Sequence, residues 1–193
     1  MIKVEILLKN MLARSCIKLL EFAFKNKPAV IITHVELGKI SLKYNPENIT
    51  LEEIMFIIND LGFDSISDPE EIIVERIKQA AIELIFYANN TNSLIRNSDY
   101  ISQKLQLPYQ RLSKIFSRTT GKTLEKYIIM LKIEKAKEMI AKNQYSLSEI
   151  AFMLDYSSIQ YLSNQFKTVA GVTLSEFKES PLKYRIPLED LLS

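Results

Sequence analysis

The sequence has few of the residues from which catalytic and metal-binding sites are built. Its 193 residues include one cysteine, one histidine, four glycines and no tryptophan. The single cysteine, Cys16, excludes a disulfide within the chain and fits a reducing compartment. The sequence has no further histidine and no glycine-rich phosphate loop. It therefore lacks the residues that nucleophilic catalysis, phosphoryl transfer and zinc sites usually require. The composition therefore argues against an enzyme.

A long hydrophobic run is also missing. No stretch approaches the roughly 20 apolar residues that a membrane span needs, and no basic segment followed by an apolar core opens the chain. Hydrophobic residues make up 47% and charged residues 25% of the sequence, which is typical of a soluble globular protein with one or two domains. We therefore expect a cytoplasmic protein that does not enter a membrane.

The small net charge of +2 hides an uneven distribution. Residues 1–74 carry a net charge of −3, residues 75–185 carry +7, and the last eight residues carry −2. A basic segment of this kind attracts a phosphate backbone. The charge alone is also consistent with a solvated basic surface.

The first part of the chain alternates strand-like and helix-like segments. A helix with apolar residues at helical spacing is expected over 12–25, and a second one after the capping box Thr50-Leu51-Glu52-Glu53. The segments expected to form strands are 2–9, 29–36, 39–44 and 63–66. The order βαββαβ over 1–67 predicts a ferredoxin-like plait, so the fold class is α+β.

The rest of the chain is expected to be helical. Asp68 and Pro69 begin a linker helix. This helix and the break at Asn89–Asn92 after it make up the linker, 68–92. A DNA-binding domain is expected over 93–180, followed by a partly disordered tail over 181–193. Its helices are expected at 98–105, 109–118, 123–142, 147–154, 158–169 and 173–179.

This helical part repeats itself at an offset of fifty residues. Aligning Ser98–Tyr127 with Ser148–Phe177 gives eight identities and no gap. The repeated unit is two short helices, a turn and a Gly-Xaa-Thr corner, which predicts two tandem helix-turn-helix units. The identical pairs are Ser98/Ser148, Gln110/Gln160, Leu112/Leu162, Ser113/Ser163, Phe116/Phe166, Gly121/Gly171, Thr123/Thr173 and Leu124/Leu174.

The stretch 75–180 resembles the DNA-binding domain of the AraC/XylS family of bacterial transcription regulators. The resemblance is carried by SKIFSRTTGKTLEKYI (113–128), LKIEKAKEMI (131–140) and LSEIAFMLDYSSIQYLSNQFKTVAGVTLSEFK (147–178). It implies two helix-turn-helix units on either side of a long linker helix. The second helix of each unit would enter one of two successive major grooves.

Helical spacing separates buried from DNA-facing positions on the two recognition helices. Leu112, Ile115 and Phe116 form an apolar stripe on the first, and Leu162 and Phe166 do so on the second. Gln and Asn side chains can form two hydrogen bonds with adenine, and Lys can donate to guanine. The candidates for phosphate contacts are Arg111, Arg118, Lys122 and Lys167. The candidate DNA-binding residues are Gln110, Arg111, Ser113, Lys114, Arg118, Gln160, Tyr161, Asn164 and Lys167.

Two positions depart from the pattern of the family. Asp155 stands where the family usually has glycine in the turn of the second unit, a position that often needs a positive φ. Leu174 stands where the family has proline after the Gly-Xaa-Thr corner. From these departures we expect the second unit to dock less rigidly, so that the first recognition helix contributes more specificity.

Residues 1–67 resemble the heavy-metal-associated domain, whose loop motif is Met-Xaa-Cys-Xaa-Xaa-Cys. Here the loop reads Met11-Leu12-Ala13-Arg14-Ser15-Cys16, and YNPENITLEEIMFIINDLGFD (44–64) matches the second half of that domain. Met11 is expected to be core, and Ala13 replaces the first cysteine. One thiolate cannot hold Cu(I) tightly alone. Cys16 is thus a candidate soft-metal ligand only if it is paired across a dimer.

Three roles remain open for this N-terminal domain: structural or dimerising, metal binding through Cys16, and sensing of another signal. Arg14 and a helix start would favour a Cys16 thiolate, but the sequence favours a buried inert cysteine over a redox sensor. His34, in an expected strand, could face the core or solvent.

The sequence thus predicts a regulator that binds double-stranded DNA and has no resident cofactor. RNA polymerase and a second copy of the chain are further candidate partners. The alternative is a metal-handling or protein-interaction module that binds Cu(I) or another soft metal through Cys16.

Overall fold

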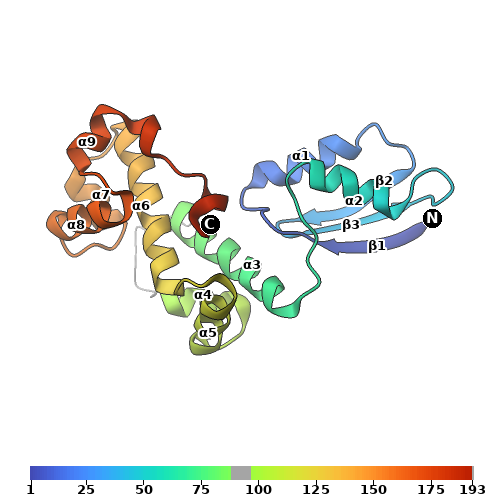
Figure 1. Ribbon diagram of the computed structural model, residues 1–193, viewed down its shortest axis with the longest axis horizontal. Coiled ribbons are helices and arrows are strands. Elements are labelled where there is room, and N and C mark those ends of the chain that lie inside the picture. Colours follow the sequence, from blue (N-terminus) through green and yellow to red (C-terminus); the bar gives the residue numbers. More distant parts are fainter. Residues whose placement is uncertain (88–96, 193) are drawn as a thin grey trace. The chain divides into compact units, whose positions relative to one another are not determined.

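The computed structural model describes residues 1–87 and 97–192, and these fall into two compact units, 1–79 and 80–193. The first unit combines a small sheet with helices, and the second is built of helices and short turns (Figure 1).

An antiparallel sheet with the strand order β1-β3-β2 organises the first unit. Its strands are β1 (Ile2–Leu7), β2 (Val30–Glu36) and β3 (Lys39–Tyr44). Two helices, α1 (Arg14–Phe24) and α2 (Leu51–Asp60), pack on one face of this sheet (Figure 1). The core combines residues of all five elements, because alternate strand residues and one stripe of each helix are apolar.

The expected fourth strand, 63–66, does not form. An isolated bridge joins Leu8 to Ser65, flanked by hydrogen bonds of 2.8 Å from the Ile66 amide to the Leu7 carbonyl and from the Lys9 amide to the Asp64 carbonyl. After Ile66 the chain turns into the Asp68 cap of the next helix, so the pairing ends after this one bridge. The sheet therefore has three strands, and the complete ferredoxin-like plait predicted from the sequence is not seen.

The helix α3 (Pro69–Ile82) begins as predicted at an Asp68 cap. The Asp68 side chain accepts hydrogen bonds from the amides of Glu70 and Glu71, at 2.7 and 3.0 Å. After Ile82 the chain continues as a π-helical segment, Glu83–Tyr87. The break predicted at Asn89–Asn92 lies outside the described residues.

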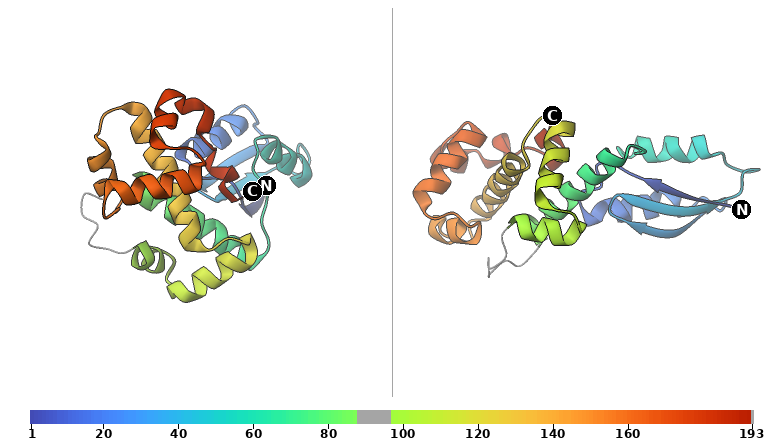
Figure 2. Two further views of the ribbon diagram at one scale, coloured as in Figure 1. Left: turned by 60° about the vertical axis from the view of Figure 1, so that its left-hand side comes forward. Right: turned by 90° about the horizontal axis from the view of Figure 1, so that it is seen from below.

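The helices of the second unit agree with the predicted ones to within one or two residues at their ends, as helix assignments usually do. The long helix α6 contacts helices on both sides of it in the sequence, and eleven of its nineteen residues are buried. Figure 2 shows the helices of this unit from two further directions. They are α4 (Asn97–Leu105), α5 (Tyr109–Thr120), α6 (Leu124–Lys142), α7 (Leu147–Met153), α8 (Ile159–Ala170) and α9 (Leu174–Glu179).

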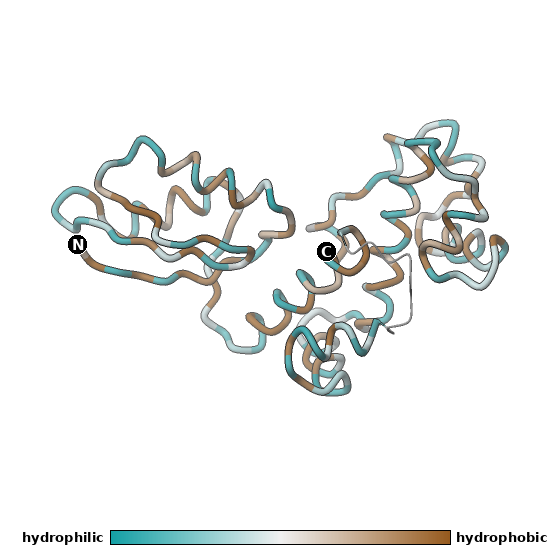
Figure 3. The backbone as a smooth tube through the Cα atoms, turned by 180° about the vertical axis from the view of Figure 1, so that it is seen from behind, coloured by the Kyte–Doolittle hydropathy of each residue, from teal (hydrophilic) through white to brown (hydrophobic). Residues whose placement is uncertain are grey.

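Hydrophobic and hydrophilic residues alternate along these helices, as the colouring in Figure 3 shows. The apolar stripes meet in two aromatic pairs. Phe116 lies against Tyr127 with 5.3 Å between ring centroids, and Phe166 meets Phe177 edge to face at 5.4 Å. Each pair joins the second helix of one helix-turn-helix unit to the helix that follows it.

The C-terminal segment is packed rather than partly disordered as expected. It forms two 3-10 turns, Pro181–Tyr184 and Leu188–Leu192, and Leu191 is only 2% exposed. The amino group of the buried Lys137 donates to the Tyr184 carbonyl oxygen at 2.6 Å. These contacts join residues that stand far apart in the sequence, so no local pattern predicts an ordered tail.

Candidate nucleic-acid interface

The Gly-Xaa-Thr corner has the same geometry in both halves of the repeat. Gly121 and Gly171 end α5 and α8 in the left-handed region, with φ of 72° and 73°. Thr123 and Thr173 then cap α6 and α9 through their side-chain oxygens. A residue with a Cβ is disfavoured at such φ values, which accounts for glycine at both corners.

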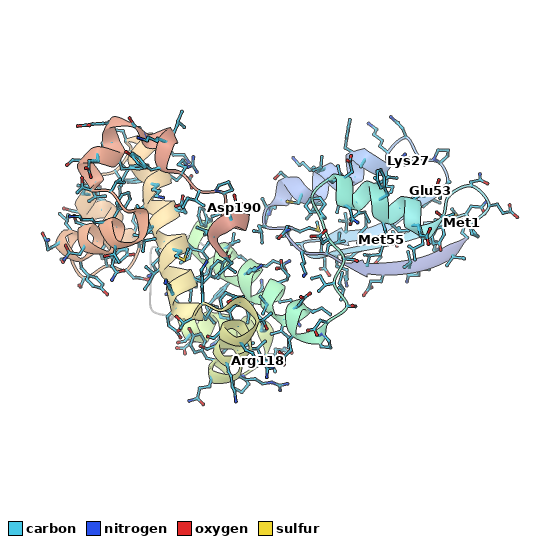
Figure 4. All side chains as sticks on the ribbon, viewed as in Figure 1. Met1, Lys27, Glu53, Met55, Arg118 and Asp190 are labelled. Carbon is cyan, nitrogen blue, oxygen red and sulfur yellow. The ribbon has the colours of Figure 1, made fainter. Side chains whose placement is uncertain are left out.

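The helix α5 separates an apolar stripe from a polar surface, as predicted. Leu112, Ile115 and Phe116 are buried. Figure 4 shows Arg118 on the outer side of this helix. Of the candidate DNA-binding residues here, Ser113 is half-buried, and the exposed ones are Gln110, Arg111, Lys114 and Arg118.

The helix α8 shows the same division, with Leu162 and Phe166 buried. Its candidate residues Gln160, Tyr161, Asn164 and Lys167 are all exposed. The Gln160 amide nitrogen donates to the Asn164 side-chain oxygen at 3.2 Å, so these two side chains orient one another. The structure therefore brings the predicted residues of each unit together on one helical surface.

Lys122 was also a candidate for phosphate, but the structure gives its amino group another role. It is half-buried and donates to the Leu191 carbonyl oxygen at 3.2 Å. This contact ties the corner after α5 to the C-terminal tail. Lys122 is thus part of the packing of the tail.

Asp155 adopts the positive φ that its place in the turn was expected to need, at 58°. Its carboxylate lies 3.7 Å from the amino group of Lys132, a residue of α6 that is only 8% exposed. Burial lowers the pKa of Lys132, and the Asp155 charge opposes that effect. The residue that replaces glycine therefore also attaches the turn to the long helix.

Leu174, the second departure, is accommodated at the start of α9. It is the first residue of that helix and is 7% exposed. The preceding Thr173 forms a complete capping box with Glu176, in which the side chain of each residue bonds the backbone amide of the other. Proline is not needed to start the helix, because this cap satisfies its free amides.

The predicted metal loop of the first unit is only partly buried. Met11 is fully buried, as expected of a core residue, and Cys16 is half-buried in the first turn of α1. His34 is exposed, and its ring nitrogen lies 3.7 Å from the Glu36 carboxylate. Over residues 1–87 and 97–192, no three Cys, His, Asp or Glu side chains gather as a metal site would require.

Sequence reasoning missed the polar contacts that attach each unit to α6. The Tyr109 hydroxyl donates to the Glu125 carboxylate at 2.9 Å, which joins the start of α5 to the start of α6. Burial and this hydrogen bond raise the pKa of Tyr109 above its ordinary value. The two residues stand sixteen positions apart, and no local sequence pattern signals such a pair.

Comparison with known proteins finds a match for most of the helical region. The family model described as "Helix-turn-helix domain" matches residues 101–180. The matched region includes α5, α6 and α8 and thus all nine candidate DNA-binding residues. The match supports the AraC-type resemblance, whereas the heavy-metal-associated resemblance of residues 1–67 stays a prediction.

Two curated relatives are similar over about half of this chain. The xylose operon regulatory protein of Escherichia coli K12 is 27% identical over 100 residues, which are 52% of this chain and 26% of the relative. The Msm operon regulatory protein of Streptococcus mutans is 24% identical over 118 residues, 57% of this chain and 42% of the relative. The chain thus spans less than half the length of either.

No solved structure matches the chain. Within the described residues, none of the helices is both long enough and apolar enough to span a membrane.

Proposed function

We propose that this protein is a cytoplasmic, sequence-specific DNA-binding regulator of transcription, and not an enzyme. The observation that carries the proposal is the repeated geometry of the two helix-turn-helix units. Both second helices end at a glycine of nearly equal φ, and both present polar residues opposite a buried apolar stripe. Two similar reading elements in one chain suit two successive major grooves of one duplex.

The exposed residues divide into those that suit bases and those that suit phosphate. Gln110, Gln160 and Asn164 have amides that can bond adenine in two places, and Lys114 can donate to guanine. Tyr161 and Ser113 add hydroxyl groups to the same surfaces. The Gln160–Asn164 hydrogen bond limits the rotamers of both amides before DNA arrives, which lowers the entropy cost of binding.

Phosphate contacts would supply most of the affinity. Arg111, Arg118 and Lys167 are exposed on the two reading helices, and the segment 75–185 carries a net charge of +7. Because phosphate contacts release condensed counterions, binding should weaken steeply as salt increases.

The first unit serves, in this proposal, as a structural, dimerising or sensing domain. A homodimer and an encounter with RNA polymerase are part of the same proposal. The alternative role, a soft-metal module that depends on Cys16, predicts metal binding without discrete DNA complexes. These two readings are separated by one assay.

That assay is a mobility shift on genomic fragments in the presence of competitor DNA. We expect discrete complexes that resist competitor, and weaker binding when Lys114 or Asn164 is changed to alanine. Lys18→Ala is the matched control, because Lys18 is exposed on α1 in the other unit. A chain that gives no discrete complex, or that loses as much binding with Lys18→Ala, would contradict the proposal.

A further inference from the structure

The first unit contains a cavity of about 460 Å³ beside the helix α3. It is lined by the end of β1, the turn between β2 and β3, and the part of α3 between Ile72 and Gln79. Its volume lies in the range of small-molecule sites, which combine apolar walls with a few polar groups. The apolar walls include Leu7, Ile66 and Ile72.

Two polar side chains of α3 line this cavity without partners. Arg76 and Gln79 stand three residues apart and therefore share one side of the helix. Within the described part of the chain, neither side chain makes a hydrogen bond or ion pair. Their neighbour Glu75 differs, because it pairs with Lys78 and accepts from the Asn10 amide at 3.2 Å. The guanidinium and amide donors thus remain available.

The wall of the cavity depends on a glycine. Gly38, in the turn between β2 and β3, has a φ of 81°. A Cβ at this position would lie 2.5 Å from the side-chain nitrogen of Gln79. The positive φ favours glycine in this turn. A side chain here would displace the end of Gln79, so the turn and Gln79 lie close together in the wall of the cavity.

The strand side of the cavity has the opposite charge. Glu5 and Glu36 line it on either side of Lys39, with the Lys39 nitrogen 3.9 Å from Glu5 and 3.0 Å from Glu36. The hydrogen bond from Lys39 lowers the pKa of Glu36, so this carboxylate is charged at neutral pH. Two carboxylates share one ammonium group, which leaves excess negative charge on this side.

We propose that this cavity binds a small zwitterion of the amino-acid type. Arg76 and Gln79 would bind its carboxylate, because a guanidinium offers paired donors in the geometry that a carboxylate accepts. Glu5 and Glu36 would attract its ammonium group, and the apolar walls would contact its side chain. The ligand would thereby join α3 to the strands.

Such a ligand would act as an effector of DNA binding, an extension that rests on the proposed function. Ligand binding itself does not rest on it. The two are tested separately, by titrating the full chain without DNA and by mobility shift without ligand.

The experiment screens the twenty L-amino acids by thermal shift and calorimetry at up to millimolar concentration. We expect at least one to bind, and its deaminated acid and its decarboxylated amine to bind more weakly. Arg76→Gln should weaken binding about ten- to a hundredfold, the loss expected for a charge-assisted contact. Gln79→Leu should weaken it to a smaller extent.

Arg14→Gln is the matched control, because Arg14 is exposed on α1 and does not line the cavity. It should bind the ligand as the wild type does, and Arg76→Gln without ligand should still shift DNA. Three results would overturn the proposal: no amino acid binds, Arg76→Gln binds as tightly as wild type, or the deaminated acid binds equally well. If the wild-type chain binds an amino acid but gives no discrete DNA complex, only the proposed function is overturned.

Discussion

Lys137→Met should release the C-terminal tail and destabilise the helical unit. Lys137 is 1% exposed, pairs with Glu134 and donates to the Tyr184 carbonyl. The second oxygen of Glu134 accepts from the Ile186 amide at 3.3 Å. This small network attaches the tail to α6.

The magnitude follows from burial. Removing one partner of a buried ion pair typically costs about 3–5 kcal/mol, since the other charge is left without compensation. Methionine has nearly the length of lysine, so the cavity cost is small. Glu134 retains its hydrogen bond from Ile186, which favours the lower end of the range. We expect a loss of about 3 kcal/mol in the free energy of unfolding.

The assay is chemical denaturation of the full chain followed by circular dichroism, with limited proteolysis of the tail. The matched control is Lys142→Met, which removes an exposed pair with Glu138 and should cost less than about 1 kcal/mol. The double variant Glu134→Gln/Lys137→Met should lose less stability than Lys137→Met alone, because no buried charge remains. An equal loss in the two lysine variants, or a double variant worse than the single one, would refute the reasoning.

Three further predictions concern the helix-turn-helix units. Burial raises the pKa of Tyr156 to about 12, so the folded state holds the proton more tightly than the unfolded state does. About 3 kcal/mol of stability should therefore be lost as the pH rises from about 10 to above 12, and Tyr156→Phe should abolish that loss in denaturation at alkaline pH. Thr173→Ala should cost about 1 kcal/mol by removing the cap of α9, measured against the exposed Ser175→Ala. Lys114→Ala should weaken specific DNA binding by about 1–3 kcal/mol in titrations, the cost of a lost base contact. Asn164→Ala should weaken it by less, and equal losses would contradict that ranking.

Local signals predicted the helices well. The capping boxes at Thr50, Ser146 and Thr173 are all present in the structure. A cap is formed by residues three positions apart, so the sequence contains all of its information. The corners at Gly121 and Gly171 were predicted for the same reason, because each Gly-Xaa-Thr corner is also formed by residues close together in the sequence.

Contacts between distant residues could not be predicted in this way. The segment 63–66 has strand-like residues, but whether it pairs depends on the neighbouring end of β1. The tail has two prolines and little periodicity, yet Lys137 lies 47 positions from the carbonyl that it bonds. No local pattern signals such a contact, so the tail was expected to be loose.

In the candidate site, too, local features were predicted from the sequence and contacts between distant residues were not. Helical spacing identified which residues of α5 and α8 are exposed, because burial of Leu112 or Phe166 fixes the opposite side of each helix. It did not reveal that Asp155 reaches Lys132 or that Lys122 bonds the tail. These contacts decide how each unit is held.

Selection from random duplexes tests most directly whether one chain reads two successive major grooves. We expect enriched sequences with two conserved blocks about 10–10.5 base pairs apart, the spacing of one helical turn. Binding to them should weaken steeply with salt, and changes in α5 and α8 should each relax a different block. No enrichment, or a single block affected equally by changes in both helices, would show that the chain does not read two grooves.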